Sequence, residues 1–101
     1  MALTSRIVRG DLELRHDERR VFAKGHPVTL SFHEFNMLAL LLEIPGRVWS
    51  RQELQRMVGG IRAGSELKAF NRALQTLRRR LTPLLGRDPI QSVRGQGYRL
   101  L

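Results

Sequence analysis

The first thirty residues alternate between apolar and polar positions and are interrupted often by turn-forming residues. Short apolar alternations predict β-strands, and clusters of Gly, Asp and Pro between them predict turns. The expected strands are Ile7–Val8, Leu12–Leu14, Val21–Ala23 and Val28–Leu30. The expected turns are Gly10-Asp11, His16–Glu18 and Lys24–Pro27. We therefore expect a four-stranded antiparallel sheet at the N-terminal end.

The period of the apolar positions then changes to that of helices, and two helix starts are marked by capping boxes. Ser31 precedes Glu34 by three residues, and Ser50 stands in the same relation to Glu53. The first helix is expected to run to about Glu43, before Pro45-Gly46, and the second to stop at Gly59-Gly60. The residues expected to face the core are Phe35, Leu38, Leu41, Leu42, Leu54, Met57 and Val58.

A third helix is expected after a loop of residues 59–65, with Ser65 as its cap, and it runs to about Leu81 before Thr82-Pro83 ends it. At about 100° per residue, its apolar positions fall in one narrow arc. That arc holds Phe70, Leu74, Leu77 and Leu81. The opposite arc holds Lys68, Arg72, Gln75 and Arg79, with Thr76 to one side.

The chain closes with a predicted hairpin, Pro89–Val93 and Gly97–Leu101, around Arg94-Gly95-Gln96. The order of elements is that of an α+β winged helix-turn-helix, in which the second and third helices form the helix-turn-helix and the hairpin is the wing. We expect one domain over residues 7–101, preceded by a linker or disordered segment at residues 1–6.

Charge is distributed unevenly along the chain. The net charge is +9, yet residues 1–45 contain six basic and six acidic residues, whereas residues 46–101 contain twelve basic and three acidic ones. Solubility alone does not require this segregation. An excess of cations in one part of a domain favours a polyanionic partner, because each phosphate contact releases condensed counterions.

The predicted third helix and wing carry side chains suited to double-stranded DNA. Arg and Lys match guanine O6 and N7, Gln matches adenine, and Thr can meet the thymine methyl group. The candidate major-groove residues are Lys68, Arg72, Gln75, Thr76 and Arg79. Arg94 is the candidate for the minor groove, and Arg51, Arg78, Ser92 and Tyr98 are the candidates for phosphate contacts.

Simpler interpretations of these residues remain open. The helix face can be an ordinary solvated face, Arg94 an exposed turn charge, and Tyr98 a core aromatic with a hydrated hydroxyl. The absence of acidic partners on the face and the run Arg78-Arg79-Arg80 favour nucleic acid.

Other classes of protein fit the composition poorly. There is no cysteine, the three histidines are scattered, and no helix follows Gly95-Gln96-Gly97 as a dinucleotide site needs. We therefore expect no enzyme, no metal and no cofactor. The longest apolar run, Met37–Leu42, is too short to cross a bilayer, and residues 1–6 do not resemble a signal peptide, so we expect a cytoplasmic protein without membrane contact.

The chain resembles the OmpR/PhoB-type winged-helix output domain of bacterial response regulators over Ile7–Leu101. The matching segments are VTLSFHEFNMLALLLEIPGRVWSRQEL, LQTLRRRL and IQSVRGQGYRL. The resemblance implies that the third helix is the recognition helix and that Arg94 enters the minor groove. It also implies that the loop Gly59–Ser65 can touch RNA polymerase and that DNA is bound at direct repeats by tandem dimers.

The chain departs from the family in two places. Gly59-Gly60 stands where Trp-Gly is common, and Asn71, Arg72, Ala73 and Thr76 replace the usual residues of the recognition helix, so no relative's target sequence is transferred. There is no room for a receiver domain, so we expect an excised domain rather than a stand-alone regulator. Two alternatives stay open. One is a protein-interaction module that docks on RNA polymerase or a receiver domain and has only non-specific DNA affinity. The other is a general RNA or single-strand binder, which would need exposed aromatic residues.

Overall fold

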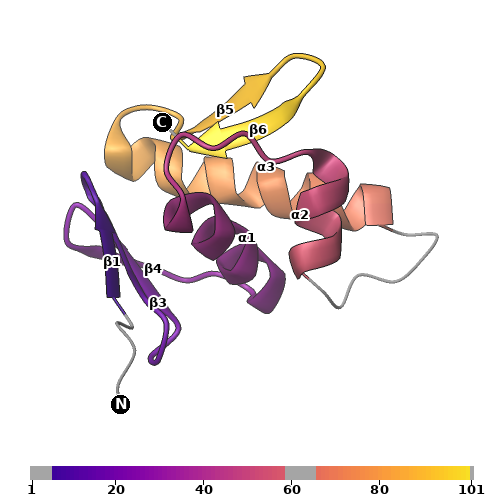
Figure 1. The fold of residues 1–101 in the computed structure, drawn as a ribbon. Coiled ribbons are helices and arrows are strands. Elements are labelled where there is room, and N and C mark those ends of the chain that lie inside the picture. Colours follow the sequence, from indigo (N-terminus) through magenta and orange to yellow (C-terminus); the bar gives the residue numbers. More distant parts are fainter. Residues whose placement is uncertain (1–5, 59–65, 101) are drawn as a thin grey trace.

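In a computed structural model, which describes residues 6–58 and 66–100, a four-stranded sheet is followed by three helices and a hairpin (Figure 1). The sheet is antiparallel with its strands in chain order. The strands are β1 (Arg6–Arg9), β2 (Leu12–Arg15), β3 (Arg20–Ala23) and β4 (His26–Val28). Leu12 and Leu14 on β2 and Val21 and Ala23 on β3 are buried, as period-two alternation requires of a sheet with one covered face.

The predicted bounds of two strands were wrong. β4 occupies His26–Val28 instead of Val28–Leu30, and Pro27 lies opposite Phe22 instead of in a turn. A proline is tolerated there because β4 is an edge strand, which has one side without ladder hydrogen bonds. β1 begins at Arg6, the last residue of the segment expected to be a linker.

Both capping boxes are confirmed. α1 (Phe32–Glu43) begins after Ser31, whose hydroxyl accepts from Glu34 N at 3.2 Å while Glu34 accepts from Ser31 N at 3.0 Å. α2 (Arg51–Val58) begins after Ser50, where Ser50 Oγ and Glu53 N are 3.1 Å apart and Ser50 N donates to Glu53 at 2.9 Å. The predicted helix stop Gly59-Gly60 and the predicted cap Ser65 lie outside the described residues.

The third helix is longer than predicted. α3 (Glu66–Leu85) continues past Thr82-Pro83 and ends at Gly86, whose N–H donates to Thr82 O at 2.8 Å and whose φ is +79°. Pro83 removes one helical donor, but the loss falls in the last turn, and Leu85 just beyond it is buried. Packing of this last turn therefore outweighs the local preference of proline.

α1 lies at the centre of the molecule, between the sheet, α2 and α3 (Figure 1). The buried stripe predicted for α1 is confirmed, and Met37 and Ala39 are buried as well. In α2, Leu54 is fully buried, but Met57 is 58% exposed, so its predicted core position was wrong. Met57 lies about 60° around the helix from Leu54, and its exposure places it at the edge of the covered face of α2.

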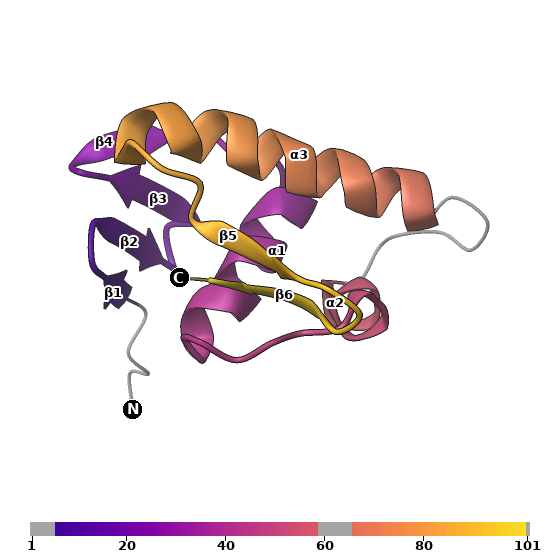
Figure 2. The ribbon, with the colours of Figure 1, turned by 90° about the horizontal axis from the view of Figure 1, so that it is seen from above.

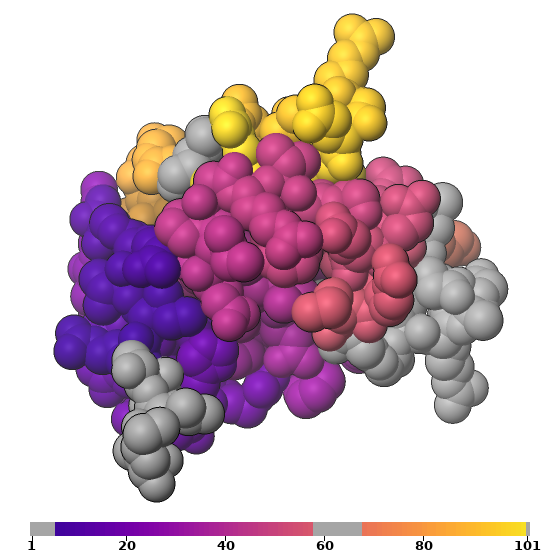
Figure 3. Space-filling view, in the orientation of Figure 1, coloured from indigo at the N-terminus to yellow at the C-terminus, as the bar shows by residue number. Residues whose placement is uncertain are grey.

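The hairpin consists of β5 (Ile90–Val93) and β6 (Gly97–Leu100). Ile90 and Leu100 pair at its base and are buried, which joins the hairpin to the core. The hairpin runs alongside α3, and its tip reaches over α2 (Figure 2). Its yellow side chains project beyond the surface formed by α1 and α2 (Figure 3). The predicted winged helix-turn-helix fold is confirmed.

Candidate nucleic-acid interface

α3 presents a polar, basic face to solvent and an apolar face to the core. The exposed side chains are Lys68, Arg72, Gln75 and Arg79. The buried side chains on the other side are Phe70, Leu74, Leu77 and Leu81. No acidic residue occurs from Leu67 to Leu85, the part of α3 that follows its first residue, Glu66. An exposed face with this composition favours a polyanionic partner.

Thr76 does not belong to this face. Its side chain was expected beside the exposed arc, but Thr76 is only 8% exposed. Ala73, which also lies outside the predicted arc of Phe70, Leu74, Leu77 and Leu81, is buried too, so the covered side of α3 is wider than that arc. The expectation that the Thr76 side chain is exposed for contact with a base was wrong, because packing of α3 against the core buries this residue.

The wing is fastened to α3 through Arg78. Arg78 Nη2 donates to Ser92 Oγ at 3.0 Å and to Ile90 O at 3.2 Å, and Arg78 Nε lies 3.1 Å from Asp88 Oδ2. Arg78 was expected to be a phosphate anchor, as was Ser92. In this structure the two side chains bind each other, and Arg78 joins the helix to β5.

The wing is fastened a second time, at β6, to the segment before α2. Trp49 N donates to Tyr98 O at 2.7 Å, and Tyr98 N donates to Trp49 O at 2.8 Å. A Cβ atom on Gly97 would lie 1.9 Å from Trp49 O, so only glycine fits beside this bridge. This bridge could not be predicted from the sequence, since pairing between such distant segments leaves no local signal.

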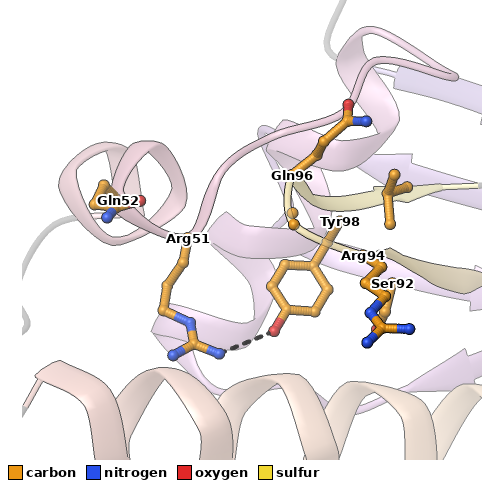
Figure 4. A pocket seen from close by; sticks show the side chains of 9 residues that line it. Arg51, Gln52, Ser92, Arg94, Gln96 and Tyr98 are labelled. Carbon is orange, nitrogen blue, oxygen red and sulfur yellow. Dashed lines mark hydrogen bonds between the residues drawn. The ribbon is translucent and has the colours of Figure 1, made fainter.

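Tyr98 also links α2 to α3. Its ring lies 5.7 Å from the ring of Phe70 at a tilt of 49°, and its hydroxyl accepts from Arg51 Nη2 at 3.2 Å (Figure 4). The Arg51 guanidinium lies 5.6 Å from the Phe70 ring as well. Tyr98 is thus a half-buried aromatic with an accessible hydroxyl, and Arg51, at the start of α2, is exposed next to it.

A shallow depression separates α2 from the wing, and several predicted contact residues line it. Arg51, Ser92 and Tyr98 lie on its wall, and Arg94 stands at the wing tip beside it (Figure 4). Along α3, Gln75 and Arg79 line a second depression together with Arg78. Because Arg78 contacts Ser92, the basic face of α3 and the wing are neighbours.

The segment before α2 is held by a small charged cluster. Arg47 Nη2 lies 2.9 Å from Glu53 Oε2, and its guanidinium stacks 3.8 Å from the Trp49 ring centre. The N–H of Ser50 binds the Glu53 carboxylate and holds its pKa below the ordinary value, with a further contribution from the Arg47 charge. These contacts fix Trp49, and with it the wing.

The described residues provide neither a metal site nor a membrane span. Over residues 6–58 and 66–100, no group of three His, Asp or Glu side chains is arranged to hold a metal ion. Within the same ranges, no helix has the length and apolar character needed to cross a membrane.

Comparison with known proteins is consistent with this geometry. The family described as "Transcriptional regulatory protein, C terminal" matches residues 25–100. The response regulator protein PmrA of Pseudomonas aeruginosa is 36% identical over 92 residues, which cover 91% of this chain and 40% of PmrA. The chain thus spans less than half the length of the curated relatives that it matches.

Solved structures agree with the fold over nearly the whole chain. The DNA-binding domain of CpxR from E. coli has a TM-score of 0.79 and 28% identity, covering 94% of each chain. The RstA DNA-binding domain of Klebsiella pneumoniae, solved in complex with the RstA box, has a TM-score of 0.78 and 27% identity, covering 94% of this chain and 95% of that one. This chain therefore belongs to the C-terminal domains of transcriptional regulatory proteins, and among them to the OmpR/PhoB-type effector domains of response regulators.

Proposed function

We propose that this chain binds a specific sequence of double-stranded DNA and thereby regulates transcription. The observation that carries the proposal is the exposed basic face of α3 beside a wing that is fastened at both strands. A helix fits the major groove, and a rigid wing beside it can reach the backbone and the adjacent minor groove. The similar RstA domain was solved with its DNA box, which supports this use of the fold.

The exposed residues divide into three roles. Lys68, Arg72, Gln75 and Arg79 read base edges in the major groove. Arg94 enters the minor groove, where a narrow groove concentrates negative potential. Arg51, Ser92 and Tyr98 contact phosphates, since all three line the depression between α2 and the wing. Thr76 has no part in this assignment, and Arg78 acts through the wing.

The neighbouring domain, the cellular compartment and the arrangement on DNA are proposed from the relatives of the chain. As an output domain it would work next to a receiver domain, in the cytoplasm, and would bind direct repeats as a tandem dimer. The loop of residues 59–65, proposed as the contact for RNA polymerase, lies outside the described residues. The proposed DNA binding requires no catalytic step.

A protein-docking module is the alternative that the experiment must separate. In that case the basic surface would attract any duplex, and binding would fall steeply with salt without preference for sequence. Binding to specific DNA instead adds base contacts, which survive at salt concentrations that remove non-specific binding.

The test is selection from a pool of random duplexes, followed by titration of the enriched duplex and a scrambled one over a range of salt. We expect one enriched motif and a preference of about a thousandfold or more over scrambled DNA. Enrichment of no motif, with equal affinity for every duplex, would contradict the proposal and favour docking on a protein partner.

A further inference from the structure

One acidic residue lies in the basic part of the interface. Residues 67–101 contain eight basic residues and a single acidic one, Asp88. Asp88 lies between the end of α3 and the start of β5, and its side chain is 44% exposed. A carboxylate at this place repels phosphates, so by charge alone it should weaken DNA binding.

The contacts of Asp88 give it a different role. Its Oδ1 accepts from Ile90 N at 3.0 Å, at the first residue of β5, and its Oδ2 lies 3.1 Å from Arg78 Nε. The same guanidinium donates through Nη2 to Ile90 O and Ser92 Oγ. One carboxylate and one guanidinium thus hold the first strand of the wing against α3 at three points of β5.

The direction of β5 decides where the wing tip lies. Arg94 follows β5 directly, so a rotation of this strand about its base moves Arg94 relative to Arg72 and Arg79 on α3. The ion pair is partly exposed and adds little to folding stability. The effect of the ion pair on the position of the wing tip is larger. A small displacement of Arg94 from its place in the groove would remove the hydrogen bonds that it makes to DNA.

We infer that Asp88, acting through Arg78, is a positioning residue that orients the wing for the minor groove, so that removal of this negative charge weakens binding to specific DNA. The inference rests on the proposed function, because it concerns the same interface. The inference predicts that removal of this charge weakens DNA binding, whereas charge repulsion alone predicts that it strengthens DNA binding.

The test is the variant Asp88→Asn, measured with the duplex that the wild-type chain enriches from the random pool. Asparagine keeps an oxygen acceptor for Ile90 N and loses the charge that holds Arg78. We expect a Kd about three- to fivefold weaker at about 0.1 M salt. Glu43→Gln is the matched control, since it removes one negative charge at the exposed end of α1, and its Kd should stay the same or fall slightly.

A double-mutant cycle with Arg94→Ala separates positioning from folding. Once Arg94 is absent, misplacement of the wing can disturb only the phosphate contacts proposed for Ser92 and Tyr98, so Asp88→Asn should cost clearly less in that background. A thermal melt by circular dichroism confirms that each variant is folded at the assay temperature. Should Asp88→Asn unfold there, Arg78→Lys gives the same reading, because it keeps the positive charge and loses the forked contacts.

Three results would overturn the inference. Tighter binding by folded Asp88→Asn would show that its charge acts by repulsion, and unchanged binding would show that it does not orient the wing. An equal loss with and without Arg94 would show that Asp88 does not act through the wing. If the wild-type chain enriches no duplex, the proposed function itself fails and the inference falls with it, which the selection shows before any variant is made.

Discussion

Trp49 and Tyr98 exchange both of their backbone hydrogen bonds, at 2.7 and 2.8 Å, across the space between the segment before α2 and the second strand of the wing. The pairing is a sheet contact of only one residue on each side. It nevertheless places the wing, because Tyr98 is also in contact with Phe70 of α3 and Arg51 of α2. The rigidity of the interface depends on this junction.

Gly97→Ala should destabilise the fold strongly. The new Cβ would lie 1.9 Å from Trp49 O, and the φ of +148° disfavours any side chain. We expect a loss of about 2–4 kcal/mol in the free energy of unfolding, measured by urea titration with Trp49 fluorescence.

Gly95→Ala is the matched control for this prediction. Gly95 also has a positive φ, +75°, but no atom lies within 4 Å of its Cβ position. The loss in the free energy of unfolding for Gly95→Ala should be limited to the backbone strain, about 1 kcal/mol. Equal losses for the two variants would show that the Trp49 bridge does not constrain the wing.

Pro83→Ala tests the observed end of α3. Alanine restores the helical donor that proline lacks, at an exposed position in the last turn. We expect the free energy of unfolding to rise by up to about 1 kcal/mol, less than the full helix-propensity difference because proline also restricts the unfolded chain. A clear loss of stability on this change would mean that Pro83 serves to end the helix.

Much of the fold could be predicted because its signals are local. The capping boxes at Ser31 and Ser50 contain donor and acceptor within four residues, and both form as expected. The wrong predictions involve tertiary packing. Pro83 was expected to end α3, but burial of Leu85 extends the helix, and Thr76 was expected to be exposed, but the core covers it.

The candidate site could be predicted only in part for the same reason. The basic positions of α3 follow from helical periodicity, and all four of the remaining major-groove candidates are exposed. The partners of Arg78 come from β5 and the turn before it, and the partner of Trp49 comes from β6. Helical periodicity contains no information on contacts between elements, so the roles of Arg78 and Trp49 could not be predicted from the sequence.

Glu53→Gln should show a stability difference that depends on pH. The pKa of Glu53 is held below 4.5 in the folded chain, chiefly by the hydrogen bond from Ser50 N. A carboxyl group with a lowered folded-state pKa stabilises the fold above its unfolded-state pKa, and this contribution is lost as the pH falls through the folded-state pKa. The difference in Tm from the wild type should therefore be largest near neutral pH and disappear as the pH falls through the lowered folded-state pKa. A difference that stays constant from neutral to acid pH would contradict the ionised capping box.

Arg79→Ala and Arg80→Ala form a matched pair for DNA binding. Both residues are exposed, adjacent and equally charged, but Arg80 lies about 100° from Arg79 around the helix and off the basic face. We expect Arg79→Ala to weaken binding to the enriched duplex by about 1–3 kcal/mol, and Arg80→Ala to have a smaller effect that is the same for all duplexes. The measurement is fluorescence anisotropy with enriched and scrambled duplexes, and equal effects of the two changes would mean that charge alone is sensed.

The central claim, that α3 reads bases, is tested most directly by the ratio of affinities for enriched and scrambled duplexes, measured for the wild-type chain and for Arg72→Ala. The account predicts that Arg72→Ala weakens binding to the enriched duplex by about 1–3 kcal/mol, leaves scrambled DNA nearly unaffected, and relaxes the preference at one base position. An equal loss for both duplexes would contradict it, because Arg72 would then contact phosphate and the face of α3 would not read sequence.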